Sequence, residues 1–218
     1  MPRFRALCIL FLFVFIFAFV SRVAQAQEPG TAITPVFLVN QEARVTNLPL
    51  LTAPSKNRSA VMATALDTIL HEPAVCCGKN SALEDVALYA SLANGLSLQL
   101  GSKLQGKHLL SDGQPIVVSA EYIPQSSIYV GFIVRTLQEQ HPLLIEWKSH
   151  VYVLYGTIFD ETRDPYAGVE DSIHKLFLLD LRFSDSRREV VFDRETDDWG
   201  KVGGLLTVAY TIQPSPWK

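Results

Sequence analysis

Cysteine is scarce in this chain of 218 residues, which contains only three. Cys8 lies in an apolar run at the N-terminus, and the other two, Cys76 and Cys77, are neighbours in the sequence. Adjacent cysteines cannot cross-link distant segments, so the sequence excludes a fold that disulfides hold together. The stability of the fold must come from a packed core, and a chain of this length is long enough to form one.

Basic residues are also fewer than acidic residues. Nineteen lysines and arginines face 22 aspartates and glutamates, which gives a net charge of −3. The first 26 residues hold three arginines and no acid, so the remaining 192 residues carry 16 basic and 22 acidic side chains and a net charge of −6. This balance excludes a protein that binds nucleic acid through its phosphate backbone.

A single long hydrophobic run, residues 6–20, stands at the very start of the chain. Arg3 and Arg5 precede it, and Ala24-Gln25-Ala26 offers the small residues of a signal-peptidase site. The run is shorter than the roughly 20 apolar residues of a membrane-spanning helix. We therefore predict a signal peptide over residues 1–26, a secreted or periplasmic protein, and no stable membrane anchor after cleavage.

The rest of the chain divides into two parts. Residues 27–58 are rich in Pro, Thr, Ala and Asn, and we expect a loosely ordered segment with one edge strand at residues 36–39. Residues 59–218 are expected to form a single domain, without internal repeats or low-complexity tracts.

Helical periodicity comes before strand periodicity in this domain. Apolar residues recur at helical spacing in four segments, residues 60–70, 81–95, 97–104 and 127–140. Short β-branched or aromatic runs divided by turns then follow, at residues 143–147, 151–159, 175–179, 189–192 and 205–210. This order predicts an α+β fold in which an N-terminal helical lobe packs on a C-terminal antiparallel sheet.

A cysteine, a histidine and a carboxylate follow one another in the order found in thiol-nucleophile enzymes. Cys77 directly precedes Gly78, His150 begins an apolar run of residues 151–156, and Asp180 ends a later strand. In such enzymes the thiolate attacks, the imidazole takes up the proton, and the acid orients the imidazole. No metal-ligand spacing such as His-Glu-x-x-His is present, so the sequence predicts neither a metal nor a cofactor.

These motifs resemble those of the papain-like cysteine peptidase superfamily, specifically the branch similar to bacteriocin-processing peptidases. In that branch Cys-Gly opens the nucleophile helix, and a histidine starts a strand that ends in glycine. The resemblance covers about residues 64–181 and implies a papain-like α+β fold. It also implies Cys77 as nucleophile, His150 as general base and Asp180 as orienting acid. The implied activity is hydrolysis of a peptide or amide bond in a peptide or protein substrate through an acyl-enzyme.

One part of the family pattern is missing. Papain-like peptidases place a glutamine about six residues before the nucleophile, whereas this chain has His71 there and no glutamine between Gln41 and Gln99. Loss of one oxyanion donor typically costs on the order of a hundredfold to a thousandfold in rate. His71 is the remaining oxyanion candidate. The capping box at residues 81–84 also starts the next helix after Cys77, which weakens the effect of the helix dipole on the thiol.

Each candidate site residue also has a structural explanation. Cys76-Cys77 can close into a vicinal disulfide or fill a small apolar space. His150 can bond to the backbone at a strand end, and Asp180 can pair with Arg182, which leaves Asp160 as a competing orienting acid. The alternative to a thiol hydrolase is therefore a catalytically inactive papain-like domain that binds a peptide or a partner protein. A redox role is weaker, because dithiol motifs usually separate their cysteines by two residues.

Overall fold

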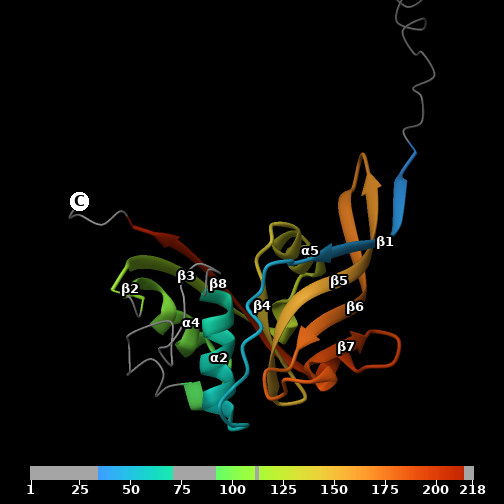
Figure 1. The fold of residues 1–218 in the computed structure, drawn as a ribbon. Helices are drawn as coiled ribbons and strands as arrows, with labels where there is room; N and C mark the ends of the chain where they lie inside the picture. The colour runs from blue at the N-terminus through green and yellow to red at the C-terminus, as the bar shows by residue number, and fades with distance from the viewer. Residues whose placement is uncertain (1–33, 71–91, 111–112, 214–218) are drawn as a thin grey trace, which may run out of the picture.

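The computed structural model describes residues 34–70, 92–110 and 113–213 (Figure 1). The predicted signal peptide, Cys76-Cys77 and His71 lie outside these residues, as does the helix expected from residue 81 onward. In chain order the elements are β1 Val36–Arg44, α2 Arg58–Leu70, η1 Leu92–Asn94, α4 Leu98–Leu104, β2 Gly106–Leu109, β3 Pro115–Pro124, η2 Gln125–Ser127, α5 Val130–Gln138, β4 Leu143–Trp147, β5 His150–Asp164, β6 Gly168–Leu179, η3 Ser186–Arg188, β7 Glu189–Asp193, η4 Trp199–Lys201 and β8 Val202–Ile212.

The strands form one antiparallel sheet of eight strands. Seven of them follow the order β2-β3-β8-β4-β5-β6-β7, and β1 pairs with the outer part of β5. Helix α2 lies against β5 and β8, α4 against β3, and α5 against β1, β5 and β6. The fold is therefore α+β with a large antiparallel sheet, which confirms the predicted class at this coarse level.

The core lies where β4, β5 and β8 meet at the centre of the sheet. Strand β4 and its neighbours contribute side chains with no exposed surface, namely Leu143, Leu144, Ile145, Val153, Leu154, Leu205 and Leu206. Strand β5 is buried without interruption over residues 151–157. A strand buried at every position has both faces covered, since successive side chains point to opposite sides of the sheet.

The helix predicted over residues 60–70 is confirmed and begins two residues earlier, at Arg58. The Asn57 side chain starts it, because its Oδ1 accepts a hydrogen bond from the backbone N–H of Ala60 at 2.8 Å. The buried side chains of α2 include Met62, Ala65 and Leu66, each with no exposed surface. No helix in the described residues combines the length and the apolar character needed to cross a membrane.

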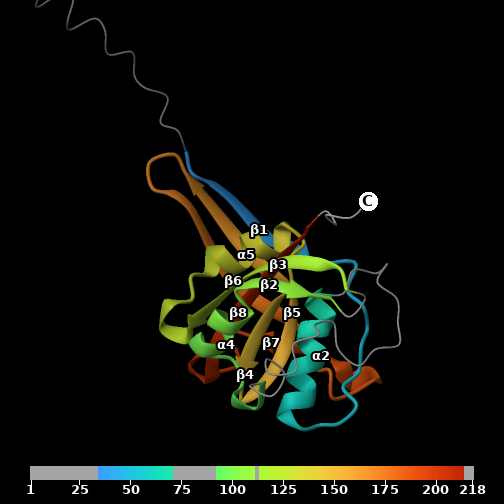
Figure 2. The ribbon, with the colours of Figure 1, turned by 90° about the vertical axis from the view of Figure 1, so that its left-hand side faces the viewer.

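Strands β5 and β6 run further than their apolar residues predicted. The sequence indicated strands over residues 151–159 and 175–179, whereas the observed strands are His150–Asp164 and Gly168–Leu179. Their polar outer halves pair with each other, and β1 pairs with β5 beside them. Figures 1 and 2 show these outer halves extending together from the rest of the sheet. We call residues 36–41 and 160–172 the arm.

Candidate functional site

His150 is placed by a tight hairpin between β4 and β5. Trp147 and His150 face each other across the two strands, so only Lys148 and Ser149 form the turn. Both turn residues have positive φ, 49° and 63°, as a two-residue type I′ hairpin requires. His150 is therefore the first residue of β5, and its side chain is exposed at this end of the sheet.

Asp180 reaches the same end of the sheet by a different route. Strand β6 runs antiparallel to β5, with Val153 opposite Leu179 and Leu154 opposite Leu178. Asp180 directly follows β6, so the register brings it to the edge at which β5 begins.

The carboxylate of Asp180 is occupied by Arg182. Its Oδ1 accepts hydrogen bonds from Nε of Arg182 at 2.8 Å and from the backbone N–H of the same residue at 3.1 Å. Its Oδ2 accepts from Nη2 of Arg182 at 2.5 Å. Asp180 is only 2% exposed, so this ion pair replaces the water that the carboxylate would otherwise bind. The pairing with Arg182 is the structural explanation that the sequence left open.

The competing acid, Asp160, is also engaged elsewhere. Its side chain accepts a hydrogen bond from the backbone N–H of Asn40 at 2.8 Å, and its Oδ2 lies 2.8 Å from Nε2 of His174. The hydrogen bond from Asn40, together with His174, lowers the pKa of Asp160 below its ordinary value. Asp160 lies ten residues along β5 from His150, which corresponds to about 33 Å in a strand. Within the described ranges no hydrogen bond joins His150 to either acid.

Cys77 and His71 lie outside the described residues, so their roles as nucleophile and oxyanion donor stay predictions. The same holds for the arrangement of Cys77, His150 and Asp180 as a catalytic unit. What the structure places is His150 and Asp180 at one end of the sheet, with Asp180 bound to Arg182.

A pocket of about 260 Å³ lies beside His150. Two segments far apart in the sequence form it, the β4–β5 hairpin and the start of α2, together with Arg182 from the loop after β6. Its lining residues are Lys56, Arg58, Val61, Ser149, His150, Val151 and Arg182. No acid lines the pocket among the described residues, although the protein as a whole is acidic.

Partners from outside the pocket hold two of its basic side chains. Nη2 of Arg58 lies 2.6 Å from Oε1 of Glu146. The Arg58 guanidinium also packs closely on Gly95, since a Cβ added to Gly95 would lie 2.1 Å from Nη2. Arg182 is held by Asp180. Both guanidinium groups thus have acidic partners outside the pocket, and that of Arg182 is the more buried of the two pairs.

Lys56 packs against the aromatic side chain of the loop that follows Arg182. Its Nζ lies 4.6 Å from the ring centroid of Phe183. Arg187 lies over the same ring, with its guanidinium carbon 4.4 Å from the centroid. Arg182 lies near it as well, with its guanidinium carbon 5.7 Å from the centroid, so three cations surround this ring on a protein with a net negative charge.

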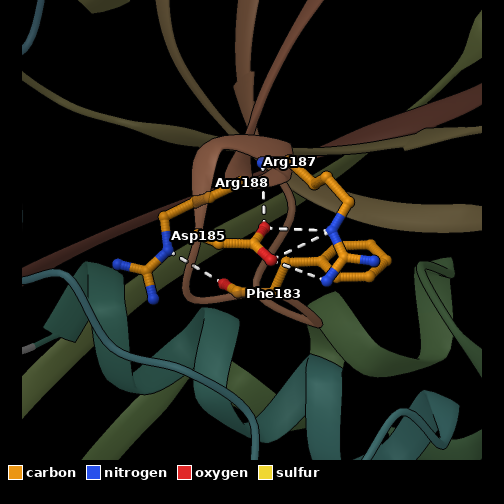
Figure 3. A network of polar contacts seen from close by, with 4 residues as sticks. All are labelled: Phe183, Asp185, Arg187 and Arg188. Atoms are coloured by element: carbon orange, nitrogen blue, oxygen red, sulfur yellow. Dashed lines mark hydrogen bonds and ion pairs between the residues drawn. The ribbon is translucent and has the colours of Figure 1, made fainter.

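The loop that carries Phe183 is well fixed by polar contacts (Figure 3). Both carboxylate oxygens of Asp185 accept hydrogen bonds from the Arg187 guanidinium, and these bonds lower the pKa of Asp185 to about 2. Nε of Arg188 donates to the backbone oxygen of Phe183 at 3.0 Å. Arg188 also donates to the hydroxyl of Thr52, which ties this loop to the segment before α2.

Sequence reasoning missed Lys56 and Arg58, because it assigned residues 27–58 to a loosely ordered segment. The signal that marked them was weak: two basic residues just before a helix in a chain with an acidic balance. The described residues contain no group of three or more His, Cys, Asp or Glu side chains suited to a metal ion.

Comparison with known proteins finds no match to a protein family model, to a curated protein or to a solved structure. The resemblance to papain-like peptidases is therefore carried by the sequence motifs alone.

Proposed function

We propose that this protein is an exported papain-like domain that binds a peptide or a partner protein at the end of the sheet where His150 lies. The observation that carries the proposal is the ion pair between Asp180 and Arg182. A catalytic imidazole works best when a third group fixes its ring and stabilises its charge. The acid that the resemblance assigns to this task is bound to an arginine instead, which favours binding over chemistry.

Two features of the sequence add support. The oxyanion glutamine of the family is replaced by His71, which removes a donor that contributes strongly to acyl transfer. The signal-peptide pattern of residues 1–26 favours a secreted or periplasmic location, where the ligand would also be met.

Thiol hydrolysis by Cys77 and His150 is the second candidate function, and one observation favours it. The His150 side chain is exposed, lines the pocket and makes no hydrogen bond within the part of the chain that the structure describes. An imidazole in this state is available to accept a proton from a thiol. In this case an acyl-enzyme would form at the sulfur of Cys77 and pass its acyl group to water.

The rate of thiol alkylation separates the two candidates. The reduced protein and its Cys76→Ser, Cys77→Ser and His150→Ala variants are treated with iodoacetamide at pH 6 and pH 8.5, and labelling is followed by intact mass. A binding domain predicts slow and similar labelling of both cysteines at pH 6, unchanged in His150→Ala, because neither thiol is activated.

A matched histidine variant serves as the control. His141→Ala removes a second exposed histidine, just before β4, and should leave the labelling rate unchanged. Rapid labelling of Cys77 at pH 6 that His150→Ala slows about tenfold or more would overturn the binding proposal in favour of the hydrolase.

A further inference from the structure

The pocket beside His150 concentrates basic side chains on a protein with a net negative charge. Lys56, Arg58, Arg182 and His150 all line a volume of about 260 Å³, and no acid lines it among the described residues. The whole chain carries a net charge of −3. A concentration of one sign of charge around a concave site raises the local concentration of ligands with the opposite sign.

Donors remain available in this pocket after the internal ion pairs are formed. Arg182 uses Nε and Nη2 on Asp180, which leaves Nη1, and Arg58 uses Nη2 on Glu146, which leaves Nε and Nη1. Lys56 has no acidic partner in the described part of the chain. Arginine and lysine donors of this kind bind carboxylate and phosphate oxygens through charge-assisted hydrogen bonds.

The start of α2 adds to the positive potential. Arg58 is its first residue, and Lys56 and Asn57 immediately precede the helix. The amino end of a helix of 13 residues carries a partial positive charge of about half an elementary charge. This effect only supplements the four basic side chains, since dipole effects fade within about one turn.

Two valines form an apolar part of the lining. Val61 and Val151 are 4% and 3% exposed, so they form a fixed surface of the pocket. A site of this size and composition fits a charged group joined to a short apolar segment, and it is too small to enclose a whole peptide.

We infer that this pocket binds an oxyanion group, a carboxylate or a phosphate, of the ligand. The inference rests on the proposed function, because it names the ligand chemistry at the same end of the sheet. Lys56, Arg58 and Arg182 supply the donors, and His150 lies at the rim on the β5 side. Carboxylates and phosphates share these donors, so the two sources are distinguished by experiment.

The test is an NMR titration of the ¹⁵N-labelled mature protein with three small compounds at constant ionic strength. Inorganic phosphate and N-acetyl-leucine supply the two oxyanions, and N-acetyl-leucine amide supplies the same apolar group without the charge. Saturable shifts of the backbone amides of residues 58–61 and 149–151 are expected with an oxyanion and not with the amide. Tighter binding of phosphate or of N-acetyl-leucine identifies the source.

Two variants with the same change of charge make the test specific. Lys56→Glu reverses a charge at the pocket and should weaken binding about tenfold or more, whereas Lys107→Glu reverses an exposed charge on β2 and should change it less than about twofold. Lys56→Gln provides a milder second variant, and thermal unfolding of each variant verifies that it is folded.

The inference is overturned when neither oxyanion shifts the pocket amides, or when Lys56→Glu and Lys107→Glu weaken binding equally. Equal weakening would mean that net charge alone attracts the anion. This outcome is independent of the alkylation experiment, which tests binding against hydrolysis through Cys77. Each proposal can therefore fail while the other survives.

Discussion

The two ends of β5 lie beside aspartates whose surroundings are opposite. At its start, Asp180 pairs with Arg182, and the aspartate is 2% exposed. Toward its outer half, Asp160 pairs with His174, and both of these side chains are more than a third exposed. The apolar residues differ likewise, since Phe37 and Tyr166 in the arm are 68% and 84% exposed.

This difference indicates where the strand carries stability and where it is free to change. A buried carboxylate without a partner costs several kcal/mol, whereas an exposed ion pair contributes little because water competes for both charges. The pocket end is thus fixed by interactions that are costly to break. The arm, by contrast, is held mainly by its backbone pairing.

The largest effect is expected when Arg182 is replaced. Arg182→Met leaves the carboxylate of Asp180 buried and unpaired, so the free energy of unfolding should fall by about 3 to 5 kcal/mol. Urea unfolding followed by tryptophan fluorescence measures this loss. Adding Asp180→Asn to Arg182→Met should recover part of it, because the buried charge is then gone.

Arg187→Met is the matched control for that substitution. It breaks an ion pair of similar geometry with Asp185, but both side chains are at least half exposed. Its unfolding midpoint should stay within experimental error of the wild type. If Arg182→Met and Arg187→Met lower the free energy of unfolding equally, burial does not determine how much an ion pair contributes to the stability of this protein.

An intermediate effect is expected at an acid of the arm that lies under α5. Burial, with a smaller contribution from Glu161, raises the pKa of Asp171 above its ordinary value of 3.8. The folded state then binds more protons than the unfolded state between 3.8 and the raised pKa, so Asp171 destabilises the fold increasingly as the pH rises through this window. Asp171→Asn should therefore be more stable than the wild type at pH 7, with a difference that shrinks toward pH 4.

Asp160→Asn, in the same arm, is expected to change the free energy of unfolding in the opposite direction. The pKa of Asp160 is lowered, chiefly by the hydrogen bond from the backbone of Asn40, so its charge stabilises the fold above pH 3.8 and this contribution is lost as the pH falls below that value. Urea unfolding between pH 3 and pH 7 should show Asp171→Asn above the wild type and Asp160→Asn below it at neutral pH. Equal and pH-independent changes would contradict both assignments.

The smallest effect is expected at the exposed aromatic side chain of β1. Phe37 is 68% exposed, so Phe37→Ser should change the free energy of unfolding by no more than about 0.5 kcal/mol. Urea unfolding measures the change. A loss above about 1 kcal/mol would mean that the arm packs more tightly than its exposure indicates.

The spacing of apolar residues predicted the helices and strands whose residues are buried. It did not predict the strand segments whose residues are polar. The helix at residues 60–70 and the strands of the sheet centre were predicted because apolar side chains at regular spacing identify a covered face. The outer halves of β5 and β6 lack such a pattern and exist because the two strands pair with each other. Backbone pairing of this kind does not require apolar residues at regular spacing, so the sequence does not indicate it.

Two of the predicted site residues lie in the described part of the chain, and their catalytic roles stay predictions. The sequence selected His150 and Asp180, and the strand register brings both to one end of the sheet. It did not select Lys56 and Arg58, which come from a segment about 90 residues before His150 and lack any motif. Whether a side chain from so distant a segment reaches the pocket depends on how α2 packs on β5 and β8.

By itself the sequence determined the acidic balance, the lack of a disulfide framework and the division between helical and strand periodicity, since these follow from composition and local spacing. Only the tertiary structure decided that Asp180 binds Arg182 and that four basic side chains share one pocket. The physical reason is that an ion pair or a pocket depends on distances across the sheet, which residue order leaves undetermined.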